Sequence, residues 1–295
     1  MAAASRRAVL GGSLALLAGC GRGRKAGGGG GEAPRDDLGR LVRLEREPQR
    51  IVSLMPANTE TLYALGAGPR LVGRDDFSDH PPEARALPSV GGLETINVER
   101  VLALTPDLVV CSEFGAQAVA LERAGLTVWA GSAQSYDEVF AVTSALGRLV
   151  GRAAEAEAVG AALKREVGRV EGALGGRPPV RVYYEIDATP YTVGPRSFVG
   201  TLIAKAGGRN VVPEGLGDFP KIAPELVVSA DPEVMVGLSL GEARARPGWG
   251  AIAAVRAGRV RQLTPEERTV ITRPGPRLGE GLRILAEIVH PGALG

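Results

Sequence analysis

Apolar residues recur along this chain in short runs separated by polar turns, and the order of these runs repeats once. Residues 96–99 (INVE) and residues 222–225 (IAPE) each close on a glutamate. In both copies a proline follows the glutamate after seven residues, an acidic residue follows after eight, and an apolar stretch comes next. Each copy therefore predicts a short helix, a break at Pro-Asp or Pro-Glu, and a buried parallel strand.

The segments around the two copies also correspond. Strands are predicted at residues 50–54 and 181–184, and a turn or loop and a helix follow each of them. After each glutamate motif, an Ala-Gly turn leads into another strand, at residues 124–128 and 257–260. Strand and helix alternate in both halves, which predicts an α/β fold with two doubly wound parallel-sheet lobes.

A single long helix is predicted between the halves. Residues 152–174 are rich in Ala, Glu, Lys and Arg, and carry an apolar stripe at helical spacing. A helix of roughly twenty residues would cover about 30 Å. That is enough to join two lobes as a strut that limits their closure to a modest rocking; a surface helix of the first lobe is the alternative. We therefore expect an N-terminal lobe at 48–150, a backbone helix at 151–177 and a C-terminal lobe at 178–295.

The first twenty residues have the layout of a bacterial export signal. Two arginines precede a short apolar run, and small residues lead into Cys20. The ending resembles a lipobox, in which Cys20 would be acylated and hold the protein on the membrane. The paired arginines also resemble a twin-arginine signal, and general secretion stays open. Residues 21–47 predict a flexible glycine-rich tether and lead-in. We expect an extracytoplasmic protein, lipid-anchored on the periplasmic side of the cell membrane; the outer surface of a cell with a single membrane is the alternative.

Composition narrows the chemistry further. The chain of 295 residues carries a net charge of only +2, which gives no support for nucleic-acid binding. Its second cysteine, Cys111, has no intrachain disulfide partner if Cys20 carries lipid, and a buried inert thiol is expected there. With only His80 and His290, a histidine-rich metal site is not expected. Neither a G-x-x-x-x-G-K-[ST] motif nor a G-x-G-x-x-G motif occurs, so the sequence shows no nucleotide-binding site.

Four sequence stretches resemble the helical-backbone, or class III, periplasmic binding proteins, and among them the cobalamin-binding proteins. They are residues 51–60 (IVSLMPANTE), 77–82 (FSDHPP), 97–109 (NVERVLALTPDLV) and 273–278 (RPGPRL). The resemblance spans about residues 48–291. It implies a monomeric substrate-binding protein of an ABC importer, whose partners are a permease dimer with its ATPase subunits. It also implies that Glu99 and Glu225, one on each lobe, dock on arginines of the permease; solvated acids in the first turn of a helix are the alternative.

The resemblance implies a small-molecule cargo held between the lobes. Cobalamin or a related corrinoid is the expected cargo, and haem and ferric siderophores stay open because aromatic residues make up only 4% of the chain. We expect no cofactor and no resident metal; His80 is a candidate ligand to a metal centre in the cargo.

Side chains that follow the predicted strands are the candidate ligand contacts, because open α/β sheets bind ligands beyond the carboxyl ends of their strands. Each of them could instead serve loop packing. They are Pro56, Ala57, Phe77 and Leu93 on the first lobe, and Tyr184, Glu185, Ser239 and Arg273 on the second. The two tryptophans, Trp129 and Trp249, are expected in the core.

One motif indicates catalysis. Residues 237–241 (GLSLG) fit the nucleophile elbow of serine hydrolases, and a strand is predicted before them. A nucleophilic serine needs a base oriented by an acid. No aspartate follows Asp231, and the only later histidine is His290. We therefore expect a binding protein and no enzyme, with a hydrolase that uses Ser239 as the minor alternative.

Overall fold

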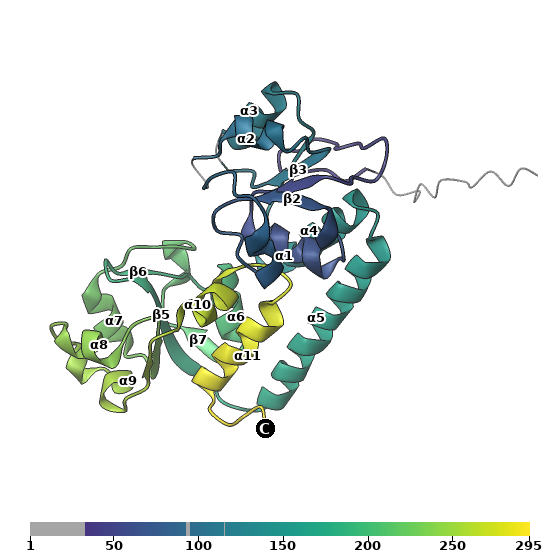
Figure 1. Cartoon of the computed structure of the whole chain (residues 1–295). Helices are drawn as coiled ribbons and strands as arrows, with labels where there is room; N and C mark the ends of the chain where they lie inside the picture. Colours follow the sequence, from purple (N-terminus) through teal and green to yellow (C-terminus); the bar gives the residue numbers. More distant parts are fainter. Residues whose placement is uncertain (1–32, 93–94, 115) are drawn as a thin grey trace, which may run out of the picture. The chain divides into compact units, whose positions relative to one another are not determined.

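The structure is a computed structural model that describes residues 33–92, 95–114 and 116–295 (Figure 1). Cys20, the rest of the predicted export signal, the glycine run and Leu93 lie outside the described residues. Within the described part, the chain forms two lobes that each contain one β-sheet.

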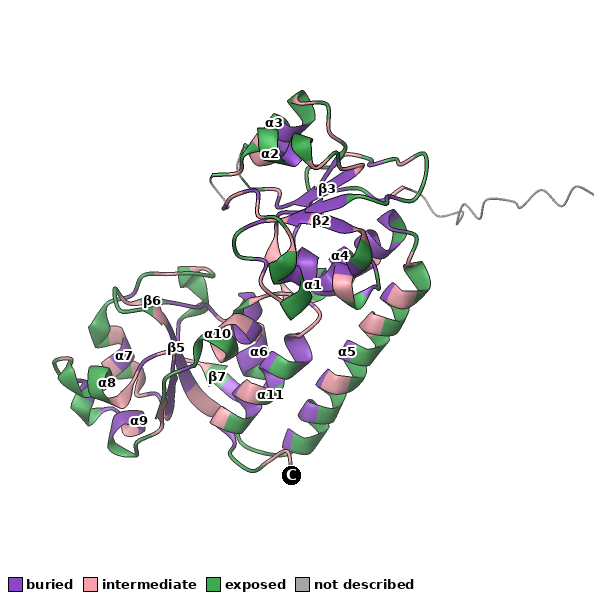
Figure 2. Ribbon diagram, viewed as in Figure 1, coloured by how far each residue is buried: buried purple, intermediate pink, exposed green. Residues whose placement is uncertain are grey.

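The N-terminal lobe holds a four-stranded sheet in the order β2-β1-β3-β4, and all neighbouring strands are parallel. Its strands are β1 (Ile51–Ser53), β2 (Leu71–Arg74), β3 (Leu108–Cys111) and β4 (Val128–Ala130). Its helices are α1 (Pro56–Ala64), η1 (Gly68–Arg70), η2 (Pro82–Ala86), α2 (Val98–Ala103), α3 (Gln117–Arg123) and α4 (Tyr136–Leu149). Every residue of β1, β3 and β4 is buried, as in a parallel sheet covered on both faces (Figure 2).

The C-terminal lobe holds a five-stranded sheet in which β5 pairs with β7 and β8, and β8 pairs with β9. Its strands are β5 (Val180–Asp187), β6 (Tyr191–Thr192), β7 (Gly208–Asn210), β8 (Val234–Val236) and β9 (Val260–Arg261). Its helices are α6 (Phe198–Lys205), η3 (Glu214–Leu216), α7 (Pro224–Ala230), α8 (Leu240–Ala245), η4 (Trp249–Ala251), α9 (Ala253–Arg256), α10 (Pro265–Thr272) and α11 (Leu278–Val289). The sheet is parallel except for β6, which folds back on the end of β5 as an antiparallel strand that the sequence pattern did not predict.

The predicted long helix is α5 (Ala153–Leu174), which ends one residue before Gly175. It packs on α4 of the first lobe and on α11 of the second (Figure 1). Its buried residues, Ala156, Leu163, Val167, Val170 and Leu174, form the apolar stripe that faces these helices. The fold is therefore the expected one: two doubly wound lobes joined by one long helix.

The internal duplication extends to individual hydrogen bonds. The acid eight residues after each motif glutamate accepts a backbone N–H at the start of the first strand of its lobe. Asp107 accepts from the Arg50 amide at 2.9 Å, and Glu233 accepts from the Arg181 amide at 3.0 Å. The residue before each motif proline has a positive φ, which is 45° at Thr105 and 43° at Asp231. The repeated Pro-Asp and Pro-Glu pairs therefore fasten a helix end to a strand start in both lobes.

One hydrophobic cluster continues from the first lobe through α5 into the second. It contains Ile51 and Val110 of the first sheet, Leu163 of α5, and Val236 and Leu285 of the second lobe. Trp129 and Trp249 are both buried, as expected from the sequence. No helix in the described part of the chain is long and apolar enough to cross a membrane.

The stretch that leads into the first strand, residues 33–47, packs on the N-terminal lobe. The Asp37 amide donates to the carbonyl of Ala130 at 2.9 Å, at the end of the edge strand β4. Asp36 accepts from the side chain and backbone of Arg40, and Val42 is buried in the main core. The first lobe therefore includes residues that lie before the boundary at 48 predicted from the sequence.

Candidate functional site

The carboxyl ends of both sheets meet at α10 and the loop that follows it. On the second lobe, the guanidinium of Arg268 donates to the carbonyl of Ile186, at the end of β5, at 3.1 Å, and to that of Gly237, after β8, at 3.4 Å. On the first lobe, Arg273 donates to the carbonyl of Phe77, in the loop after β2, at 3.1 Å. This common edge is where ligands of open α/β sheets bind.

The loop after β2 forms the first-lobe side of this edge. Its first residue, Asp75, is buried and accepts hydrogen bonds from Ser78 and Phe77; burial raises the pKa of Asp75 above its ordinary value, although these bonds oppose the shift. The Ser78 hydroxyl lies 2.8 Å from that of Thr59 on α1. The backbone of the loop is therefore held firmly, while the Phe77 ring is 58% exposed.

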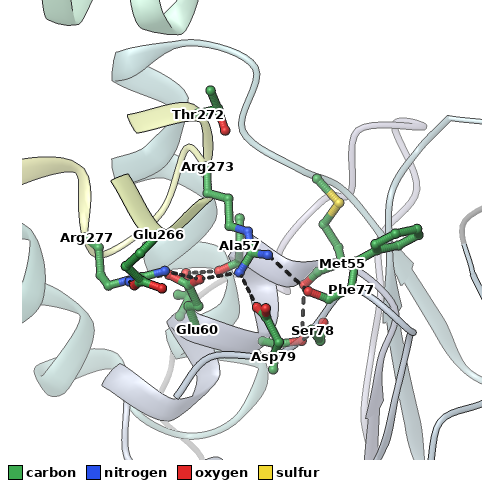
Figure 3. A network of polar contacts seen from close by, with 12 residues as sticks. Met55, Ala57, Glu60, Phe77, Ser78, Asp79, Glu266, Thr272, Arg273 and Arg277 are labelled. Atoms are coloured by element: carbon green, nitrogen blue, oxygen red, sulfur yellow. Dashed lines mark hydrogen bonds and ion pairs between the residues drawn. The ribbon is translucent and has the colours of Figure 1, made fainter. Parts of the chain in front are cut away.

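A network of charged side chains crosses between the lobes at the same place (Figure 3). Glu60 of α1, whose side chain is only 2% exposed, accepts from Arg273 at 3.0 Å and from Arg277 at 2.9 Å. Arg273 also donates to Asp79 at 2.9 Å, and Arg277 donates to Glu266 at 2.8 Å. Partial burial by itself would raise the pKa of Asp79, but the hydrogen bond and charge of Arg273 outweigh it and hold the pKa below its ordinary value.

Arg273, a candidate ligand contact from the sequence, therefore carries a cross-lobe network in the structure. Its partner Glu60 lies 213 residues earlier in the chain. One sequence signal pointed to this network, because Glu60 follows a strand within a stretch used for the family resemblance. Nothing in the sequence indicated which cation would meet it.

Tyr184 and Glu185, two other candidates, are both buried. Burial raises the pKa of Tyr184 to about 12, and its hydroxyl has no hydrogen-bond partner among the described residues. The Glu185 carboxylate accepts from both terminal nitrogens of Arg246, at 2.5 and 2.7 Å, and from the Tyr183 hydroxyl. The reason is the place of β5 inside a sheet covered on both faces: consecutive side chains are buried, so neither residue lines an open surface in this structure.

The remaining candidates occupy different surroundings. Pro56 is the first residue of α1. The buried Ala57 lies against Gly275 of the second lobe, where a Cβ added to Gly275 would be 3.5 Å from the Cβ of Ala57. Ser239 caps α8, accepting from the Glu242 amide at 3.1 Å. The half-exposed His80 lies in the same loop as Phe77.

Three exposed aromatic side chains near the carboxyl ends of the strands escaped the sequence analysis. Phe114, 56% exposed, follows β3. Tyr191 of β6 is 42% exposed, and its backbone forms an isolated antiparallel β-bridge with Lys221. Phe219, two residues before Lys221 in the chain, is 60% exposed. For Phe114 and Tyr191 the only sequence signal was a position in a loop after a predicted strand, and Phe219 had none, since exposure itself cannot be read from the sequence. Together with Phe77 they give the common edge an apolar, aromatic character.

Other expectations concern chemistry away from this edge. Cys111 is buried, which raises the pKa of its thiol to about 12, as befits an inert packing residue. Within residues 33–92, 95–114 and 116–295, no three His, Cys, Asp or Glu side chains gather so as to hold a metal ion.

Glu99 and Glu225 occupy equivalent places on the two lobes. Each lies in the first turn of a short helix, α2 or α7, and each is exposed. In the described ranges, neither carboxylate takes part in an ion pair. Two unpaired negative charges at repeated positions are thus presented to solvent, one per lobe.

Two parallel-sheet lobes on one long helix, with the carboxyl ends of both sheets at one edge, define a two-lobed binding protein of the helical-backbone class. A family model described as periplasmic binding protein matches residues 51–267. The chain is 32% identical over 264 residues to the uncharacterized ABC transporter substrate-binding lipoprotein YvrC of Bacillus subtilis (strain 168), covering 85% of this chain and 82% of that protein.

Two further similarities concern proteins with named ligands. The chain is 32% identical over 269 residues to a cobalamin-binding protein of Halobacterium salinarum, covering 84% of this chain and 71% of that one. The structure of the periplasmic haem-binding protein RhuT from Roseiflexus sp. RS-1 superposes with a TM-score of 0.73 at 26% identity, covering 83% of this chain and 99% of that one. The chain belongs to the periplasmic binding protein family and is an extracytoplasmic, non-enzymatic ABC transporter substrate-binding protein. An ABC permease and a small ligand are the partners that this family implies.

Proposed function

We propose that the cargo is cobalamin or a related corrinoid, held at the common edge where both sheets end. The observation that carries the proposal is the set of exposed aromatic side chains there, Phe77, Phe114, Tyr191 and Phe219. A flat macrocycle with a large apolar face gains most from such rings. The 32% identity to a cobalamin-binding protein supports the same class of ligand.

Of the residues that the sequence nominated, Phe77 retains a direct ligand role in this proposal. Pro56 and Ala57 contribute as the start of α1 beside it, and Leu93 stays a prediction outside the described residues. Tyr184, Glu185 and Ser239 contribute by supporting the ends of β5 and β8, since the first two are buried and the third caps a helix.

Haem and ferric siderophores are the alternative cargo, favoured by the similarity to a haem-binding structure. Haem iron needs an axial ligand, which proteins supply from His, Tyr, Cys or Met. Near the common edge, Tyr191 is exposed, and His80 and Met55 are partly exposed, so these are the candidates among the described residues (Figure 3). These side chains therefore distinguish the cargo classes.

The test is a titration of the full-length protein with cyanocobalamin, haemin and a ferric siderophore, followed by calorimetry. For a corrinoid, Phe77→Ala should weaken binding about tenfold or more, since burying a phenylalanine contributes about 1.5–3 kcal/mol. Tyr191→Phe should change affinity little, because the ring is retained. Val119→Ala, which shortens an exposed apolar side chain on α3, is the control.

The outcomes separate the alternatives. Tight binding of haemin, with its absorption spectrum altered by Tyr191→Phe or His80→Ala, would replace corrinoid by haem. Tight binding of the ferric siderophore alone would replace corrinoid by an iron complex as the cargo. If none of the three binds, the proposed cargo is wrong and the transport role remains with another ligand.

We further propose that Cys20 is lipidated and anchors the protein at the membrane, which would raise its local concentration near the importer. The similarity to a substrate-binding lipoprotein supports this. Cys20→Ser should release the protein from the membrane fraction. Retention of the variant there would contradict the anchor.

The hydrolase alternative rests on Ser239, and the geometry gives that serine a different task. Its hydroxyl forms a capping box with Glu242 at the start of α8. The late histidine of the hydrolase order, His290, lies beside the carbonyl of Gly207 at 3.2 Å. Turnover of activated esters that disappears in Ser239→Ala would revive the alternative; we expect none.

A further inference from the structure

Arg273 is tied to the first lobe by each of its terminal nitrogens (Figure 3). One of them donates to Glu60 at 3.0 Å and to Asp79 at 2.9 Å, and the other donates to the Phe77 carbonyl at 3.1 Å. A guanidinium has five N–H donors in a fixed fork. Three protein acceptors already occupy the end of that fork, so the side chain is oriented by the protein itself.

The anchor of this arrangement is Glu60. Its carboxylate is almost fully buried and is shared by Arg273 and Arg277, both from the second lobe. A buried carboxylate is tolerated only with well-placed partners, so the position of Arg273 is strongly determined. The two arginines differ in one respect. The hydrogen bonds of the Arg277 side chain go to Glu60 and Glu266, and none of them reaches the loop after β2.

The loop after β2 is held from two directions. From its own lobe, Asp75 accepts from Ser78 and Phe77, and the Ser78 hydroxyl meets Thr59. From the other lobe, Arg273 holds the Phe77 carbonyl and the Asp79 carboxylate. The ring of Phe77 is more than half exposed, so its own packing does little to fix it.

We propose that Arg273 is a positioning residue, which reaches across from the second lobe to hold residues 77–79 and thereby presents the Phe77 ring to the cargo. It acts through the loop and makes no contact with the cargo. This proposal rests on the proposed function for the meaning of Phe77 as a ligand contact. It makes the first-lobe wall of the site depend on a residue of the second lobe, so the site is complete only when both lobes are in place.

The first experiment measures the mobility of the loop after β2 without any ligand. Phe77→Trp places an indole at the exposed position, and the emission of Trp129 and Trp249 is subtracted with the parent protein. In this background, Arg273→Lys keeps the charge but not the fork. It should lower the anisotropy of the introduced indole and raise its quenching by acrylamide, by about twofold, because an unfastened loop moves on the nanosecond scale. Asp79→Asn, which weakens the same contact from the loop side and leaves Glu60 paired, should shift both readouts in the same direction.

Arg277→Lys is the matched control, because it perturbs the same buried carboxylate without touching the loop. It should leave the introduced indole at the parent values. If Arg273→Lys leaves the anisotropy and quenching unchanged, or if Arg277→Lys changes them equally, Arg273 has no specific hold on the loop and the proposal is overturned. Circular dichroism and thermal melting confirm that each variant compared is folded.

The second experiment measures affinity for cyanocobalamin, or for haemin or the ferric siderophore if one of these binds in the titration instead. Arg273→Lys should weaken binding by about tenfold in the parent protein and have almost no effect in Phe77→Ala, as expected for residues that act as one unit. A full loss that persists in Phe77→Ala would show direct contact with the cargo and overturn the proposal. If cyanocobalamin, haemin and siderophore all fail to bind, the proposed cargo fails, while the indole readout still decides the role of Arg273.

Discussion

The carboxylate of Glu185 is buried in an ion pair with Arg246, whose guanidinium lies 4.4 Å from the centre of the Trp249 ring. Removing one partner of a buried pair leaves an uncompensated charge, which costs about 3–5 kcal/mol. Glu185→Ala should therefore lower the free energy of unfolding by about that amount, measured by urea denaturation without ligand.

A double variant supplies the control for this pair. Glu185→Leu combined with Arg246→Met removes both charges, and it should recover most of the lost stability. If Glu185→Ala left the stability of the free protein unchanged and only weakened cargo binding, Glu185 would be the ligand contact that the sequence suggested.

Asp75 predicts a dependence of stability on pH. Burial raises its pKa in the folded protein above the ordinary value, so the folded state holds the proton more tightly than the unfolded state does. Stability due to Asp75 should therefore be greatest at pH values below its unfolded pKa, and should fall as pH rises through the folded pKa. Urea denaturation between about pH 4 and pH 7 should show Asp75→Asn gaining stability relative to the parent as pH rises. A constant difference across this range would contradict a raised pKa.

For individual residues, the sequence predicted which side chains follow strands, but it did not predict the contacts that these side chains make. It placed Phe77 and Arg273 after strands, but it could not show that Arg273 meets Glu60, because that contact depends on how two distant segments pack. Tyr184 is buried for a physical reason that the sequence did not reveal: β5 is covered on both faces, so burial does not alternate along the strand.

Among the elements, α5 carries glycines that its packing does not require. A Cβ built at Gly168 or Gly172 meets no atom within 4 Å. Glycine inside a helix costs about 0.5–1 kcal/mol relative to alanine. Gly168→Ala and Gly172→Ala should each raise the free energy of unfolding by about that amount, measured by chemical denaturation.

Gly147 of α4 is the matched control for these changes. A Cβ there would lie 2.5 Å from the Cβ of Ala156 on α5 and 2.9 Å from the carbonyl of Arg152. Gly147→Ala should therefore destabilise the protein, by about 1–3 kcal/mol, through overpacking where the two helices meet. Equal gains at all three positions would show that helix propensity alone decides, whatever the packing.

The elements themselves were largely predictable from the sequence. The periodic stripe of α5 and the repeated Pro-Asp and Pro-Glu signals correspond to observed elements, because both rest on local chemistry. The antiparallel β6 and the packing of residues 33–47 were not predicted, since a two-residue strand and an irregular segment carry no periodic pattern. The role of α10 and the residue after it, which connect the carboxyl ends of the two sheets through Arg268 and Arg273, also depends on tertiary packing.

For the whole molecule, Glu99 and Glu225 predict how the protein meets its importer. We propose that both dock on cationic side chains of the permease, since each is exposed on an equivalent helix of its lobe. Charge reversal by Glu99→Lys or Glu225→Lys should reduce stimulation of the importer's ATPase about tenfold and leave cargo affinity within about twofold.

Glu157→Lys controls for the change in net charge, because Glu157 is also an exposed acid but lies on α5. It should leave ATPase stimulation at the parent level, with the salt dependence of docking unchanged. If either motif variant lost affinity for the cargo instead, its glutamate would belong to the binding site and the docking assignment would be wrong.

The continuous core that runs from the first sheet through α5 into the second lobe has a thermodynamic consequence. Unfolding one lobe would expose apolar surface of the other lobe to water, so neither lobe should unfold as an independent cooperative unit. Scanning calorimetry of the free protein should then give a single endotherm, whose calorimetric enthalpy equals the van't Hoff enthalpy. Cargo that binds only the folded form should move that whole endotherm upward, by an amount set by its concentration relative to Kd.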